Sequence, residues 1–233
     1  MARKRYAITR YEIIQTASEL FFERGYSNTS PKLIAEKLKM SPGNLTYYFP
    51  TKEDLLAVLV ELLCDFQWKM FQMEADRGIE SLGCICLELL TVTYACQLHD
   101  TSRDFLISAF QSEKCREYLR NFHVERAKRI LGKQCSGWTH DQFVQAEILV
   151  MGMEYFTAIT EDSVLPIQTR IAGALDQMLR IYQVEEEIRQ REIEHVLQMD
   201  CEKIGSQVRF AFHNYVRAAN EQSLKDMLEG KDI

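Results

Sequence analysis

Residues 29–55 have the sequence TSPKLIAEKLKMSPGNLTYYFPTKEDL, and this stretch decides the fold. It contains two short helical segments joined by a tight turn, and the second segment is too short and too polar to be ordinary core packing. Ser41 can cap this second helix while Pro42 occupies the first helical position, where a missing N–H costs nothing. Pro50 then ends the helix after Phe49. The sequence therefore predicts a helix-turn-helix head that presents a short helix to a partner.

The residues on either side of this stretch make the pattern specific. The preceding helix is expected to close at Gly25, which can adopt positive φ, and Thr29 is expected to cap the next helix. The chain resembles the tetracycline-repressor (TetR) family of bacterial transcription regulators, whose signature is matched in register by Ile13, Ala17, Leu20, Phe21, Gly25, Tyr26, Thr29, Ile34, Ala35, Ser41, Gly43, Tyr48, Phe49, Lys52, Glu53 and Leu55. So many matches in register are more specific than any single short motif.

Two positions depart from the family pattern. Lys39 stands where the family usually has a glycine in the turn, so either this lysine adopts the turn conformation at some strain or the turn differs slightly. Thr46 replaces a tyrosine that commonly touches the phosphate backbone of DNA in the family. Tyr47 or Tyr48 could make that contact instead.

The resemblance implies that the head, residues 1–55, binds a double-stranded DNA operator. Leu45 and Phe49 share one face of the second helix, which leaves its polar residues free to meet the operator. The residues predicted to contact DNA are Thr29, Ser30, Lys32, Ser41, Pro42, Gly43, Asn44, Thr46, Tyr47, Tyr48 and Lys52. Among them we expect phosphate contacts from Thr29, Ser30, Tyr47, Tyr48 and Lys52, and approaches to base edges from Gly43, Asn44 and Thr46.

The charge distribution agrees with a polyanionic partner for the head. The whole chain has a net charge of −6, whereas residues 1–55 contain nine Lys or Arg against six acidic residues, which leaves −9 for the remainder. This polarity directs the basic head towards nucleic acid and keeps the acidic remainder away from it. Without the helix-turn-helix pattern, a small excess of lysine would be only a solvated surface.

The rest of the chain, residues 56–233, is predicted to form an all-α body. Beyond Pro50 only Pro166 interrupts the helical pattern. Thr51 and Asp54 fit a capping box that opens a helix leading from the head into the body. Further helices are predicted at residues 79–99, 102–111, 113–132, 139–160, 166–183, 186–200 and 203–229. By resemblance, this larger domain binds an effector and forms a dimer.

The helix predicted at 139–160 is apolar nearly all round, so two of its faces must be buried. With the helix after it, this helix resembles the pair through which the family forms homodimers, packed as a four-helix bundle. The predicted interface residues are Phe143, Ile148, Met151, Tyr155, Ile171, Ala174, Leu175 and Met178. The alternative is that both helices are internal core of a monomer. The segment beyond about residue 185 could cap the body or enlarge the interface.

The resemblance also implies a pocket for a small-molecule effector. The candidate lining residues are Trp68, Phe71, Thr93, Gln97, Phe110, Phe122, Met151 and Tyr155, and ordinary core packing is the alternative for each. Glu147 and Glu154 could bind a cationic ligand or pair with Arg170 or Arg180 across the dimer. An enclosed apolar cavity of roughly several hundred Å³ would favour a ligand-responsive regulator. A solid core would favour a DNA-binding dimer that responds to a partner protein or to cysteine oxidation.

Other classes of protein find little support in the sequence. The five histidines are scattered and no catalytic constellation or glycine-rich phosphate loop accompanies them, so we expect no enzyme. Cysteine and histidine spacing does not fit a metal site, and no cofactor is expected. The seven cysteines form an odd, irregular set that suits a reducing compartment. No signal sequence or membrane-length apolar run is present, so we expect a cytoplasmic protein that does not bind membranes.

Overall fold

The structure, a computed structural model, describes residues 2–76, 81–161 and 163–218. These residues form eleven α-helices and no strand, which confirms the all-α prediction. The helices are α1 (Ala2–Arg24), α2 (Pro31–Lys37), α3 (Pro42–Tyr48), α4 (Lys52–Asp76), α5 (Ser81–Leu98), α6 (Asp100–Gln111), α7 (Glu113–Leu131), α8 (His140–Ile159), α9 (Ile167–Ile181), α10 (Glu186–Leu197) and α11 (Cys201–Ala218). The helix predicted at 203–229 corresponds to α11, and residues 219–229 lie outside the described part of the chain.

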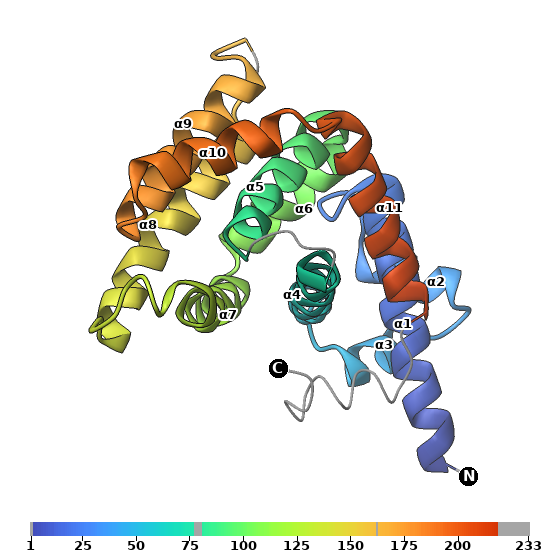
Figure 1. The fold of residues 1–233 in the computed structure, drawn as a ribbon. Helices are drawn as coiled ribbons and strands as arrows, with labels where there is room; N and C mark the ends of the chain where they lie inside the picture. The colour runs from blue at the N-terminus through green and yellow to red at the C-terminus, as the bar shows by residue number, and fades with distance from the viewer. Residues whose placement is uncertain (1, 77–80, 162, 219–233) are drawn as a thin grey trace.

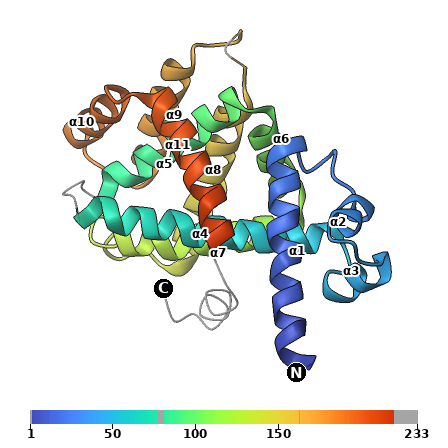
Figure 2. The same cartoon turned by 90° about the vertical axis from the view of Figure 1, so that its right-hand side faces the viewer.

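The head packs around the apolar face of α1. Ile13, Ile14 and Phe21 of α1 are almost completely buried against α2, α3 and the start of α4. Thr51 begins α4 as predicted, because its backbone N–H donates to the Asp54 carboxylate at 3.0 Å. This helix then runs from the head across the body, and Figures 1 and 2 show it lying beside α7.

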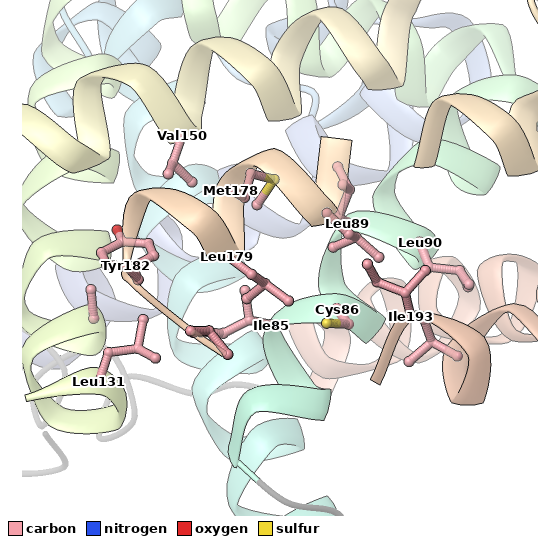
Figure 3. Packing of buried hydrophobic residues seen from close by; sticks show 14 of the residues in the cluster. Ile85, Cys86, Leu89, Leu90, Leu131, Val150, Met178, Leu179, Tyr182 and Ile193 are labelled. Atoms are coloured by element: carbon pink, nitrogen blue, oxygen red, sulfur yellow. The ribbon is translucent and has the colours of Figure 1, made fainter. Parts of the chain in front are cut away.

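The largest core lies in the body, where α5 packs against α8, α9 and α10. Its centre is filled by Leu89, Leu90 and Leu179, which are almost fully buried, and Figure 3 shows these side chains meeting Met178 and Ile193 from neighbouring helices. Because α5 is apolar on all sides, it serves as the central element that the other helices surround.

The C-terminal segment returns to the head. α10 packs on α5 and α9, whereas α11 crosses α5 and lies beside α1 (Figures 1 and 2). The Tyr11 hydroxyl of α1 donates to the Val216 carbonyl, and Gln15 Nε2 donates to the Arg217 carbonyl at 2.8 Å. The segment beyond residue 185 therefore caps the body, which is one of the two alternatives predicted for it, and it also joins the body to the head.

Across the described residues, no individual helix has both the length and the hydropathy needed to cross a membrane. The bent pair formed by Leu82–Leu98 and Asp100–Gln111 reaches the required length and hydropathy when the two helices are taken together, and this rests on length and composition alone.

Candidate functional site

The second helix of the helix-turn-helix, α3, is held by one apolar face and presents the other. Ser41 caps it as predicted, with its hydroxyl accepting from the Asn44 N–H at 3.2 Å, and Pro42 begins the helix. Leu45 is buried in the head, whereas the side chain of Tyr47 is 72% exposed. A polar, outward-facing helix of this length can enter the major groove of DNA.

The turn between α2 and α3 is made by a residue in the left-handed region. Lys39 has φ +53°, and the Met40 N–H next to it donates to the Ala35 carbonyl at 3.0 Å. Of the two alternatives for Lys39, the structure has the strained one, in which the lysine itself adopts the glycine conformation. Gly25 likewise closes α1 with φ +89°, as predicted.

The side chains on the outer face of α3 differ in what they can offer to a base. Gly43 and Asn44 are exposed, and a side chain at Gly43 would meet nothing within 4 Å. The Thr46 hydroxyl is exposed too, but it donates to the Pro42 carbonyl at 2.9 Å, so its hydrogen is already engaged. Asn44 is therefore the residue of this face with a complete set of amide donors and acceptor for a base edge.

Two predicted DNA contacts have other partners in the protein. The prediction that Thr29 caps α2 is wrong, because Ser30 is the cap and accepts from the Leu33 N–H at 3.2 Å. Thr29 is buried, and its hydroxyl donates to the Gly25 carbonyl at 2.8 Å, so it stabilises the turn and does not reach a phosphate. Lys52 Nζ donates to the Tyr26 carbonyl at 2.9 Å and lies 4.0 Å from the centre of the Tyr26 ring.

Lys32 and Lys52 are the two lysines of the predicted set, and they differ in accessibility. The Lys32 side chain is 80% exposed and lies 3.9 Å from Glu36, a weak contact that leaves it available. Lys52 is half-buried, and burial lowers the pKa of its ammonium group. Lys32 is consequently better placed for a phosphate than Lys52.

The body contains a cavity of about 220 Å³ between α4, α5, α6, α7, α8 and α11, with further walls from α1. Phe110 and Tyr155 line it as predicted, and their rings stack with centroids 4.6 Å apart. Trp68, Thr93, Gln97, Phe122 and Met151, which were also predicted for the effector pocket, do not line this cavity. Met151 and Phe122 pack in a separate apolar cluster with residues of α4 and α7. The Phe71 side chain lies outside the described residues.

A group of charged side chains lies at the α7 and α8 end of the cavity. Arg126 of α7 donates to Glu88 of α5, and His123 Nδ1 lies 3.8 Å from Glu147 and 3.7 Å from Glu154. Burial raises the pKa of Glu154 well above its usual range and lowers that of His123 well below. The Glu147 carboxylate accepts from the Tyr182 hydroxyl, yet burial still raises its pKa.

This arrangement corrects the pairing predicted for Glu147 and Glu154. Both contact His123 inside their own chain, whereas Arg170 donates to the Thr157 carbonyl and Arg180 to Asp176. The side chains that surround Glu147 and Glu154, namely His123, Arg126 and Glu88, were not predicted from the sequence. His123 and Arg126 are three residues apart and therefore share one face of α7, but only the packing of α5 and α8 shows what that face contacts.

Most of the predicted dimer-interface residues lie inside the chain. Phe143, Met151, Ile171, Leu175 and Met178 are buried within one protomer, so these predictions are wrong. Ala174 is half-buried against the same core, and its place in the interface stays a prediction. Tyr155 lines the cavity. Ile148 is 55% exposed and remains available, together with Leu149 and Phe156 of α8, which were not predicted.

All seven cysteines are free and buried. Burial raises the pKa of Cys86 and Cys96 to about 12, and it also raises the pKa of Cys64 and Cys115. Thiols of this kind are poor nucleophiles and are slow to oxidise.

The geometry defines a helix-turn-helix DNA-binding head joined to an all-α body with an internal cavity. Residues 13–59 match the model of the family described as "Bacterial regulatory proteins, tetR family". Residues 13–59 thus have the DNA-binding domain of the TetR family, which confirms the resemblance for the head.

Curated relatives extend the likeness beyond the head. The HTH-type transcriptional regulator HbdR of Aromatoleum sp. (strain CIB) is 29% identical over 141 residues, covering 58% of this chain and 60% of HbdR. The uncharacterised HTH-type transcriptional regulator YuxN of Bacillus subtilis (strain 168) is 30% identical over 138 residues, covering 54% of this chain and 47% of YuxN. The aligned part thus spans about half the length of these relatives.

Among solved structures, Salmonella enterica GusR has the same fold with a TM-score of 0.51 at 19% sequence identity. That match covers 76% of this chain and 96% of the GusR chain. It extends the fold assignment from the head to the body.

Proposed function

We propose that this protein is a dimeric transcriptional repressor that binds a near-palindromic DNA operator and is released from it by a small-molecule effector. The observation that carries the proposal is α3, a capped helix with a buried Leu45 and an exposed polar face, within a basic TetR-family head. Bacterial DNA lies in the cytoplasm, which is where such a repressor acts.

Contacts with the operator divide into two kinds. Ser30, Lys32, Ser41, Tyr47, Tyr48 and Lys52 hold the phosphate backbone, and Pro42, Gly43, Asn44 and Thr46 lie at the base edges. Asn44 offers its amide to a base such as adenine. Thr29 is left out because its side chain is buried.

An operator selected from random DNA tests this division. Asn44→Ala should lose roughly 1–3 kcal/mol on the selected operator and little on random DNA, whereas Lys32→Ala should weaken both and reduce the salt dependence. Lys203→Ala, a change at an exposed lysine of α11, is the matched control. If Asn44→Ala behaved like Lys32→Ala and lost as much affinity for random DNA as for the operator, the division would be refuted. If no DNA bound to the protein could be selected, the proposed function would be refuted.

Dimerisation uses the outer face of α8 together with α9. Ile148, Leu149 and Phe156 are large apolar side chains exposed on α8, and a second copy of the same helices can bury them by two-fold symmetry. The two heads then reach two half-sites whose separation is one helical turn of DNA or a multiple of it.

The effector acts through α4. This helix leaves the head with Leu55 and Leu59 in the core of the head, and further along it lines the cavity with Leu63, Phe66 and Met70. A ligand that shifts α4 changes the spacing of the two heads. The ligand must bind the released arrangement better than the DNA-bound one, with a typical coupling of about 1–3 kcal/mol. Saturating operator DNA should therefore weaken ligand binding by the same factor. A ligand affinity that operator DNA leaves unchanged would show that the cavity does not control release from DNA.

The alternative is a DNA-binding dimer that responds to a partner protein or to cysteine oxidation. The cavity of about 220 Å³ favours the effector model over a solid core. The buried, high-pKa thiols such as Cys86 disfavour oxidation.

A further inference from the structure

The charged group at one end of the cavity has more carboxylates than cations. Glu88, Glu147 and Glu154 approach from α5 and α8, and among the described residues Arg126 is the permanently charged cation that lies with them. Arg126 is already bonded to Glu88. Because burial keeps His123 neutral, the other two carboxylates depend for positive charge on the same Arg126 that Glu88 already binds.

Two polar groups at this end lack partners inside the protein. His123 is almost fully buried, lines the cavity, and its Nδ1 accepts or donates no hydrogen bond; Glu147 Oε2 beside it also has none. The Glu154 side chain lines the cavity, lies 3.7 Å from His123 Nδ1 and also interacts electrostatically with Arg126. Buried carboxylates are normally compensated by positive charge, so a cation that enters the cavity can stabilise this group.

We propose that the cavity binds a small organic cation, with its charged nitrogen beside Glu154 and its apolar part against Phe110 and Tyr155. The proposal names the effector class of the function proposed above and rests on it. Phe110 and Tyr155 offer stacked aromatic rings next to the carboxylate, which attract a cation as well as an apolar body.

Other charges around the cavity agree with this orientation. Arg209 lines the cavity from α11, beside α1, whereas Glu154 lines it from α8 (Figure 1). The Arg209 guanidinium donates to the Phe22 carbonyl and to the hydroxyls of Thr101 and Ser102, so it neutralises no carboxylate of the group. Within the described residues no set of three or more His, Cys, Asp or Glu could hold a metal ion, which favours an organic cation over a metal.

Binding should be coupled to proton release. Burial favours the neutral, protonated form of Glu154, and a cation beside it favours the carboxylate. The proton then passes to the buffer as the ligand enters. His123, Arg126, Glu88, Glu147 and Tyr182 are the titratable groups around Glu154, and Cys64 of α4 interacts with Glu88 and Arg126 of the same group.

Isothermal titration of the full chain without DNA tests the proposal with three probes of similar size. These are benzyltrimethylammonium, its neutral isostere neopentylbenzene, and phenylacetate. We expect the cation to bind best, with heats that differ between phosphate and Tris buffers because a proton is released. Glu154→Gln should weaken the cation about tenfold or more and remove the buffer dependence. Glu125→Gln, at an exposed carboxylate of α7, is the control and should change neither.

Glu154→Asp keeps the charge and should retain the proton release, which guards against a Glu154→Gln variant that folds poorly. Stronger binding of phenylacetate or neopentylbenzene, or cation binding that Glu154→Gln leaves unchanged, would overturn the inference. Operator binding with no cation binding would overturn the inference alone, whereas cation binding by a chain that binds no operator would overturn the proposed function.

Discussion

Lys39 is the residue at which the head departs most clearly from an unstrained backbone. A lysine at φ +53° pays a steric cost that glycine avoids, so Lys39→Gly should raise the free energy of unfolding by about 1 kcal/mol. Lys32→Gly is the matched control, because glycine inside α2 should lower stability by about 1 kcal/mol. Urea denaturation measures both, and a loss of stability in Lys39→Gly would show that the lysine side chain compensates for its backbone.

The buried carboxyl of Glu154 should impose a pH dependence on stability. Its folded-state pKa is raised above the usual 4.5, so its contribution is complete below that value and is lost as the pH rises through the folded pKa. Glu154→Gln carries no such group. The variant should therefore gain stability over the wild type as pH rises, by roughly 1 kcal/mol or more at about pH 8 and by little near pH 4.

Urea denaturation across this pH range checks the Glu154 prediction. Burial lowers the pKa of His123, which acts in the opposite sense, but both proteins contain His123 and its effect cancels in the difference. Glu125→Gln should show no comparable trend because Glu125 is exposed and pairs only with Lys128. A difference between wild type and Glu154→Gln that does not change with pH would contradict a raised pKa.

At the scale of helices, α11 is fastened to two other elements through Arg209. Its guanidinium reaches the Phe22 carbonyl of α1 at 2.9 Å and the Thr101 hydroxyl of α6 at 3.1 Å. Arg209→Met keeps much of the apolar stem but loses these bonds, and we expect a loss of about 2 kcal/mol. Hydrogen exchange should show faster opening of α11 and α1. Arg217→Met, at an exposed position of α11, should leave both unchanged; an equal effect would mean that α11 is held by helix packing alone.

The helices themselves could be predicted from sequence, because capping residues such as Ser41 and Thr51 act on neighbours three residues away. Which face each helix buries was harder to predict from the sequence. α8 is apolar nearly all round, so periodicity gave no single buried face, and Met151 was placed in an interface although it packs on α4 and α7. Arg126 was missed for a related reason: its partner Glu88 lies 38 residues away, on another helix.

For the molecule as a whole, α4 and α11 are two of the helices that connect the head to the body, and α6 also packs on α1. α4 continues directly from the helix-turn-helix, and α11 comes back to α1 from the far end of the chain (Figure 2). The cavity has walls from both α4 and α11, including Phe66 and Phe212, whose rings lie 5.6 Å apart. A ligand in this cavity thus contacts both connections at once, which gives it two routes to the spacing of the heads.

We expect two chains to assemble into a dimer whose interface lies on α8. Leu149 is 59% exposed beside Ile148 and Phe156, so Leu149→Asp would place a charge in the buried centre of a two-fold contact. Sedimentation at micromolar concentration should show monomers. Operator affinity should fall about a hundredfold or more because each head then binds its half-site alone. Phe210→Asp is the control, since Phe210 is equally exposed but lies on α11; dissociation by this change and not by Leu149→Asp would move the interface to α11.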